Sequence, residues 1–351
     1  MRTTSIRKIP QFEPYFDDEE VVAVTEVLRS GWVNEGEKTR EFEREFCRVS
    51  GSRHAVTVTS GSVALFLALK ALKVGPGDEV IVPDLTFAAD ANAVLFLGAK
   101  PVLVDVNHDG NIDQVVVKGA LTPNTKAIIA VNMNGRSVAR EVFQESSIPI
   151  IEDCAQSLGN RQTGNRSLMT CYSLASTKHL TTAQGGVITT SDEECHDELL
   201  RLKDHGRNTR VTTGRVEDYY DHVGLNFKFT EIQAAIGIAQ LKKFPEKMRR
   251  LSQIYNEYRK HLGSMLLKPD GYWYVDIKAK NPRLLTKELA SRGIGSRLQY
   301  VPLHQQPLYR STADFPVADD LYNTTLFLPS STNLTNEEVA HVSQTVMELS
   351  R

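Results

Sequence analysis

The feature that most constrains the fold of this chain is a series of short apolar segments that alternate with longer ones between residue 55 and about residue 190. Each short segment is nearly continuous in apolar and β-branched residues, which is typical of strands buried on both faces. The segments between them are long enough to be crossover helices. This alternation predicts an α/β fold with a mainly parallel sheet. The predicted strands are AVTVT (55–59), EVIVP (79–83), PVLVDV (101–106), KAIIAV (126–131) and IPIIED (148–153), and the predicted helices are SVALFLALKAL (62–72), ADANAVLFLG (89–98) and a stretch near 138–146.

Beyond residue 170 the pattern continues and then changes. CYSLAS and GVITTS predict two further strands, followed by a helix over about 192–204 that Ser191 and Glu194 would open as a capping box. After Phe229, EIQAAIGIAQLKKF predicts a helix that continues through 246–263. YWYVDI (272–277) then predicts a strand, 285–292 a helix, and Thr335 with Glu338 the start of a C-terminal helix. We therefore expect a large α/β domain over 1–240 and a small α+β domain over 241–351.

Composition excludes several classes of function. The chain of 351 residues carries 41 Lys and Arg against 43 Asp and Glu, so it has no net field for nucleic acid or an anionic membrane. No stretch approaches the roughly 18 apolar residues of a membrane span, and no apolar run follows the basic N-terminus as in a signal peptide. The four cysteines lack metal-ligand spacing. We expect a cytoplasmic protein without a structural metal.

Lys178 is the first candidate for chemistry, because it closely follows a predicted strand in CYSLASTKHLTTAQGG. Loss of solvation there would lower the pKa of its amine, and a neutral amine can form a Schiff base with an aldehyde. Ser173, five residues earlier, could place a hydroxyl nearby as an anion ligand. A solvated surface group is the more common role for a lysine, so Lys178 alone decides nothing.

Two further segments carry candidate ligands. Asp153 ends a predicted strand, at the edge where a parallel sheet binds ligands. It could cap the next helix, or pair with the protonated ring nitrogen of a pyridoxal cofactor. Ser60, Gly61 and Ser62 lie between a strand and an apolar helix, where backbone N–H groups can bind a phosphate. A capped turn without a ligand fits equally well, and the Walker and dinucleotide glycine patterns are absent.

Taken in order along the chain, these segments resemble the sugar aminotransferases of the DegT/DnrJ/EryC1/StrS group, a branch of the fold-type I pyridoxal-phosphate enzymes. The resemblance covers nearly the whole chain. It rests on GWVNEGEKTREFEREF, TSGSVALFLAL, GDEVIVPDLTFAADANAVLFLGAKPVLVDV, IIEDCAQSLG, YSLASTKHLTTAQGGVITT, GLNFKFTEIQAAIGIAQL and YVPLHQQPLY.

The resemblance implies a role for each matching position around the cofactor. Lys178 corresponds to the Schiff-base lysine and Asp153 to the partner of the pyridine nitrogen. The remaining cofactor positions are Phe87, stacked on the ring; Gln156, against the ring or its phenolic oxygen; Gly61, Ser62 and Ser173, at the phosphate, with Ser60 in the same turn; and Asn226, which reaches the phosphate from the neighbouring subunit of a homodimer. A role for Phe87 as a core aromatic is also open.

On the substrate side, the resemblance assigns Trp32 and Asn34 to a loop that lines the sugar pocket and His304 to the mouth of the site. Arg297 could pair with a substrate diphosphate. Structural roles for His304 and Arg297 are also open. The segment NMNGRSVAR (132–140) and the short connection before residue 285 depart from the family pattern, so the identity of the sugar does not carry over.

The implied activity is transfer of an amino group, from L-glutamate as the expected donor, to a nucleotide-linked keto-sugar through pyridoxal 5'-phosphate and pyridoxamine 5'-phosphate. KHLTTAQGG and GLNFKFTEIQAAIGIAQL most resemble perosamine-synthase-type members, which aminate a 4-keto-6-deoxy sugar. Two alternatives stay open. One is a cofactor-dependent sugar dehydratase, in which His replaces the lysine, and His179 adjoins Lys178. The other is a non-catalytic regulatory homologue.

Overall fold

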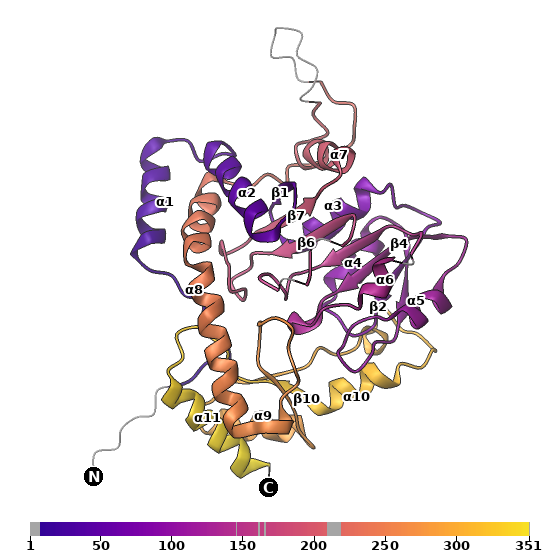
Figure 1. Cartoon of the computed structure of the whole chain (residues 1–351). Coiled ribbons are helices and arrows are strands. Elements are labelled where there is room, and N and C mark those ends of the chain that lie inside the picture. The colour runs from indigo at the N-terminus through magenta and orange to yellow at the C-terminus, as the bar shows by residue number, and fades with distance from the viewer. Residues whose placement is uncertain (1–7, 145, 161, 165, 209–218, 351) are drawn as a thin grey trace.

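A seven-stranded sheet forms the centre of the computed structural model, which describes residues 8–144, 146–160, 162–164, 166–208 and 219–350 (Figure 1). The strand order is β1-β7-β6-β5-β4-β2-β3. Pairing is parallel from β6 to β3 and antiparallel on both sides of β7. The strands are β1 (His54–Val58), β2 (Glu79–Pro83), β3 (Lys100–Val104), β4 (Thr125–Val131), β5 (Ile150–Asp153), β6 (Met169–Ser173) and β7 (Gly186–Thr190).

Helices cover both faces of this sheet because its central strands are apolar on both sides. Along β2, Val80 and Val82 belong to the core under α3 and α4, whereas Ile81 belongs to the core on the opposite face. Alternate side chains of a strand point to opposite faces, so a strand of this kind must be covered twice. The helices of this part are α1 (Asp18–Ser30), α2 (Glu37–Ser50), α3 (Gly61–Ala71), α4 (Ala89–Phe96), α5 (Gln114–Ala120), α6 (Arg140–Gln144), α7 (Glu193–Lys203) and the 3₁₀ turn η1 (Met133–Gly135).

A smaller part follows along the helix α8 (Glu231–Leu262), which is continuous through Pro245 (Figure 1). One end of α8 packs against α1 and α2 and the other against α11. The antiparallel three-stranded sheet of this part has the order β8-β10-β9. Its elements are η2 (Gly263–Met265), β8 (Asp276–Lys278), α9 (Pro282–Ser291), β9 (Arg297–Leu298), η3 (Leu303–Gln305), α10 (Pro316–Thr324), β10 (Thr325–Phe327) and α11 (Asn336–Leu349).

The architecture confirms the predicted fold class, an α/β protein with a mainly parallel seven-stranded sheet and a smaller α+β part. The predicted division at residue 240 falls inside α8, and Ile9 packs in the core of the smaller part, so segments from both sides of residue 240 build each part. The two-domain division stays a prediction. No helix among the described residues is long and apolar enough to cross a membrane.

Three local predictions differ from the structure. Asp192, rather than Ser191, caps α7, because its carboxylate accepts the Cys195 N–H. Only Asp276 and Ile277 of the predicted strand 272–277 lie in β8. Helix α5 was not predicted; Asp113 caps it through the N–H groups of Val115 and Val116. The capping box at Thr335 and Glu338 is confirmed.

The two parts meet through the loop after β4. Arg136 Nη1 lies 2.8 Å from Asp276 Oδ2, and both side chains are almost fully buried. The Asn134 side chain donates to the Tyr274 carbonyl and accepts from the Tyr274 N–H. Gly135 has φ +79°, and a Cβ there would lie 2.6 Å from the Gly271 carbonyl oxygen. The loop that departs from the family pattern therefore holds the segment 271–276 against the sheet.

Replacing Arg136 by Met should lower the free energy of unfolding by about 3–5 kcal/mol, because it leaves the Asp276 carboxylate buried without its partner. Arg136→Met/Asp276→Leu should recover most of this loss, since neither charge is then buried. Denaturant unfolding measures both changes. Arg40→Met, which breaks an exposed pair with Glu37, is the control and should cost about 1 kcal/mol or less. Equal losses for the Arg136 and Arg40 variants would contradict this prediction.

Candidate active site

A cavity of about 290 Å³ lies where β5 and β6 end and α3 begins. Parallel strands present their carboxyl ends along one edge of a sheet, which is where open α/β sheets bind ligands. Residues of the smaller part complete the wall. The described residues around the cavity are Ser60, Gly61, Ser62, Leu65, Phe87, Ala89, Asp153, Ala155, Gln156, Cys171, Tyr172, Ser173, Ala175, Thr177, Lys178, Gln184, Trp273, Arg297 and Tyr300.

Most of the residues singled out from the sequence come together here. Nine of the thirteen line this cavity, although they span the chain from residue 60 to residue 297: Ser60, Gly61, Ser62, Phe87, Asp153, Gln156, Ser173, Lys178 and Arg297. The four others, Trp32, Asn34, Asn226 and His304, lie outside it.

The start of α3 forms a cradle for an anion. Ser60 caps the helix by accepting the Val63 N–H at 3.2 Å, and the first N–H groups of a helix have no partner within it. A Cβ on Gly61 would lie 2.8 Å from the Ser173 Cβ, and one on Gly186 would lie 2.3 Å from the Ser60 carbonyl oxygen. Only glycine fits these two positions, so the turn is shaped by close approach of the backbone.

Lys178 is half-buried in the cavity wall, with its Nζ 4.4 Å from the centroid of the Trp273 ring. The pKa of this amine is lowered to about 8, chiefly by desolvation; the Asp153 carboxylate opposes the shift and the Arg297 charge adds to it. At pH 7 about a tenth of Lys178 is therefore uncharged, as a nucleophilic amine must be, against far less for an ordinary lysine.

His179 takes no part in the cavity. Its Nε2 donates to the Trp273 carbonyl at 2.8 Å, and burial lowers the pKa of the imidazole to about 4. The ring thereby secures the segment that carries Trp273, whereas Lys178 presents the reactive group.

Asp153 occupies the end of β5 and faces the same cavity. Its Oδ1 accepts the Ala155 N–H at 2.7 Å, and burial raises the pKa of the carboxyl while the Ala155 N–H and Lys178 lower it. The described residues between β5 and β6 contain no helix, so the Asp153 Oδ1 fixes a turn there rather than capping a helix. The Gln156 Oε1 accepts the Asn134 N–H at 2.8 Å, which orients the amide group of that side chain.

Aromatic and cationic side chains form the outer wall. Phe87 is 55% exposed, and its ring centroid lies 6.0 Å from that of Tyr300. The Arg297 guanidinium lies 4.7 Å from the centroid of Tyr300. A flat apolar face beside a positive charge suits a ligand that has both a ring and an anionic group.

The remaining candidates have other surroundings. Trp32 and Asn34 are exposed in the loop between α1 and α2, and Asn226 is exposed with its Oδ1 bound to the Lys228 N–H. The His304 Nδ1 lies 2.6 Å from Asp84 Oδ2, and its ring stacks on Phe315. Contact of these four residues with cofactor or substrate stays a prediction.

Trp273 and Tyr300 are cavity residues that were not singled out from the sequence, and both come from the smaller part. Asp90, which does not line the cavity, was not singled out either; it is a fully buried acid in the first turn of α4. Each reaches the site only through packing of distant segments. The aromatic run around Trp273 was a usable signal, but its alternation with apolar residues predicted a strand.

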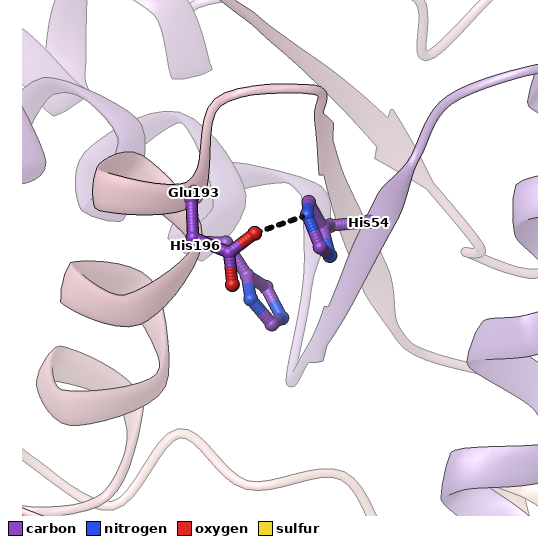
Figure 2. A group of neighbouring side chains, drawn as sticks. All are labelled: His54, Glu193 and His196. Atoms are coloured by element: carbon purple, nitrogen blue, oxygen red, sulfur yellow. Dashed lines mark ion pairs between the residues drawn. The ribbon is translucent and has the colours of Figure 1, made fainter. Parts of the chain in front are cut away.

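One group of three potential metal ligands occurs among the described residues, away from the cavity (Figure 2). His54 begins β1, and Glu193 and His196 lie in the first turn of α7; the Glu193 carboxylate is 3.2 Å from His54 Nε2. The two imidazoles stack at 4.2 Å with an interplanar angle of 14°, and Arg53 also pairs with Glu193 at 3.5 Å. Stacked rings do not direct their lone pairs to one point, so the group is better suited to joining β1 to α7.

Comparison with known proteins agrees with the geometry. The model of the DegT/DnrJ/EryC1/StrS aminotransferase family matches residues 14–347. The chain is 33% identical to the spore coat polysaccharide biosynthesis protein SpsC of Bacillus subtilis (97% of both chains) and 32% identical to GDP-perosamine synthase of Escherichia coli O157:H7 (98% of this chain, 99% of that one). Its fold resembles that of Spr1654 from Streptococcus pneumoniae in the PMP form, with a TM-score of 0.91 and 29% identity over 97% of this chain and 99% of that one.

The Lys178 amine of the cofactor-free protein should become half reactive near pH 8, against about 10.4 for an ordinary lysine. Arg297→Gln should move this midpoint to higher pH because it removes a charge that lowers the pKa, and Asp153→Asn should move it to lower pH. Reductive methylation with formaldehyde, followed by mass spectrometry of the Lys178 peptide across pH, measures the midpoints. Unshifted midpoints in both variants would exclude this electrostatic coupling.

Proposed function

We propose that this chain, which belongs to the DegT/DnrJ/EryC1/StrS aminotransferase family, moves an amino group from L-glutamate to a nucleotide-linked 4-keto-6-deoxy sugar. Family membership makes the protein an enzyme of the pyridoxal-phosphate-dependent sugar aminotransferase type. The donor and the sugar are our proposal. The observation that carries it is the placement of Lys178 and Asp153 in one cavity with the start of α3.

The residues of the cavity suit three groups of pyridoxal phosphate: its phosphate, its pyridine nitrogen and its aldehyde. The free N–H groups at the start of α3, together with Ser60, Ser62 and Ser173, suit the phosphate. Asp153 suits the pyridine nitrogen, and Lys178 suits the aldehyde carbon. When bound, the cofactor supplies an aldehyde that condenses with amines and a ring that withdraws electrons.

The protein contributes positioning and proton transfer. Lys178 Nζ, uncharged in part near neutral pH, can accept a proton from the carbon that bears the transferred nitrogen and later return one. Asp153, which lines the cavity, would hold the ring nitrogen of the bound cofactor in its protonated state through an ion pair. Trp273 covers Lys178 from the side of the smaller part and limits access of water to the amine.

Substrate recognition is assigned to the outer wall. Arg297 lies at the cavity beside Tyr300 and suits an anionic group, the glutamate carboxylate in one half-reaction and the substrate diphosphate in the other. The similarity to GDP-perosamine synthase supports a 4-keto-6-deoxy sugar as acceptor. We assign Trp32, Asn34 and His304 to the rim that the sugar contacts.

We further propose a homodimer with shared active sites. Asn226 and neighbouring apolar side chains, Val223 at 86% and Leu225 at 60% exposure, are turned to solvent in the single chain. An exposed apolar patch of this kind suits a subunit interface. Burial there would bring Asn226 toward the phosphate end of the second subunit's cavity.

No specific observation favours either alternative function, that of a sugar dehydratase or of a non-catalytic regulatory homologue. A dehydratase of this family would carry a histidine at the position of Lys178, and the neighbouring His179 is committed to the Trp273 carbonyl. A binding module would need neither an amine of lowered pKa nor an acid in the same cavity. Both features support a catalytic role.

Lys178→Ala should lower the production of 2-oxoglutarate from L-glutamate and a nucleotide-linked 4-keto-6-deoxy sugar by about a thousandfold or more, as expected for loss of both nucleophile and base. In the wild type, borohydride should fix the cofactor covalently to Lys178. Lys247 is a matched control, because its pKa is also lowered to about 8 but it lies outside the cavity. Labelling of Lys247 instead, or full turnover by Lys178→Ala, would refute the assignment.

Shared sites predict complementation between two inactive variants. A Lys178→Ala subunit lacks the amine, and an Asn226→Asp subunit lacks the amide that would reach the phosphate in its partner's site. A mixed dimer would contain one site in which both residues are intact. Co-expressing them should restore up to about a quarter of wild-type activity, since half of the dimers are mixed and each has one competent site. Activity no higher than that of the separate variants would mean that each subunit builds its own site.

A further inference from the structure

Asp90 is a buried acid to which the proposed function assigns no role. It lies in the first turn of α4, is 0% exposed, and accepts the Thr86 hydroxyl at Oδ2 at 2.6 Å. Its other oxygen, Oδ1, receives no donor from any described residue. Asp90 and Asp153 lie close enough for each to shift the pKa of the other. Asp90 therefore adjoins the acid that faces the cavity.

Two carboxyl groups in contact and away from water cannot both be ionised, because like charges repel strongly at low dielectric. The surroundings decide which of them holds the proton. Asp153 receives the Ala155 N–H and faces the Lys178 charge, both of which stabilise a carboxylate. Asp90 receives only the Thr86 hydroxyl. The other titratable groups near Asp90, Cys171 and Tyr300, are neutral and buried, and they supply no positive charge.

We propose that Asp90 holds a proton at neutral pH and donates it in a hydrogen bond to the Asp153 carboxylate, so that Asp90 is a positioning residue for the acid that faces the cofactor ring. The oxygen without a donor is thereby explained, since a carboxylic acid O–H is itself a donor. The direction of the pKa of Asp90, raised well above its ordinary value by burial and then by Asp153, agrees with this arrangement.

The hydrogen bond has two consequences for Asp153. A donor to the charged form favours that form, so Asp153 stays ionised although it is buried. It also makes Asp153 a weaker base, so that the proton shared with the pyridine nitrogen stays on the nitrogen. This second consequence rests on the proposed function, whereas the position of the proton on Asp90 does not.

The protonated state is tested in the cofactor-free protein by infrared spectroscopy. The difference spectrum of wild type minus Asp90→Asn at pH 8 should contain the C=O stretch of a protonated carboxylic acid, displaced in D₂O. The difference spectrum of wild type minus Asp113→Asn, a variant that changes the cap of α5, should lack this C=O band. Absence of the band from the Asp90 difference would overturn the inference.

Stability against pH gives a second test. Since the folded protein keeps a proton on Asp90 that the unfolded chain releases above about pH 4, wild-type stability from this group falls as pH rises toward the raised pKa. Asp90→Asn carries no such proton. Its Tm relative to wild type should therefore rise from pH 5 to pH 9, and a difference that is constant with pH would count against the proposal.

The effect on the cofactor is tested with pyridoxal phosphate labelled with nitrogen-15 in the ring. Asp90→Asn places an amide N–H where the acid O–H was. The nitrogen-15 resonance of the cofactor bound to this variant should therefore stay at the wild-type position, that of the protonated ring. Asp90→Ala removes the donor, and its resonance should move toward that of neutral pyridine, as for Asp153→Asn. If Asp90→Ala does not fold, Asp90→Leu serves as a second variant without a donor.

A wild-type resonance in the variants without a donor refutes the positioning role. Failure of the wild type to bind the cofactor refutes the proposed function, while the infrared band still decides where the proton lies.

Discussion

Desolvation of Lys178 is the constraint on which the site depends, because a lysine in water is charged and unreactive at neutral pH. The sheet alone does not produce it. Trp273, from the smaller part, covers the amine at 4.4 Å, and Trp273 is held in turn by His179 and by the loop 132–137. The buried Arg136–Asp276 pair therefore serves the chemistry indirectly, by fixing the segment that excludes water from Lys178.

The cavity combines one amine, one carboxylate and one helix N-terminus within about 290 Å³, and each suits a different group of the same cofactor. Their charges also act on one another. Asp153 opposes the loss of charge on Lys178, and Arg297 favours it. With Asp90 neutral behind Asp153, the acid pair carries a single negative charge. The protonation states of this site are thus set by side chains from segments far apart in the sequence.

Much of the fold and of the inner site could be predicted because both depend on local sequence. Strand β2 was predicted with its observed bounds, since EVIVP is apolar throughout and bounded by turns. Asp153 ends β5 and Lys178 follows β6, and these two strands pair in parallel, so both residues lie at one edge of the sheet. Ser60 follows β1, which runs in the same direction as β6 because both pair antiparallel with β7. Trp273, Tyr300 and Asp90 could not be found in this way, because their relation to Lys178 and Asp153 exists only when distant segments pack. The α7 cap was misassigned by one residue, since Ser191 and Asp192 are both good caps and only backbone direction separates them.

The sequence by itself determined the periodicity of the strands and helices, the glycine at the tight start of α3, and the order of the ligand-bearing segments. These follow from side-chain alternation and backbone sterics, which act over a few residues. Tertiary structure alone decided that Lys178 lies half-buried against Trp273, that Asp153 has a second acid near it, and that His304 pairs with Asp84. Desolvation and charge coupling act through space, so the pKa of a group depends on neighbours that the order of residues does not reveal.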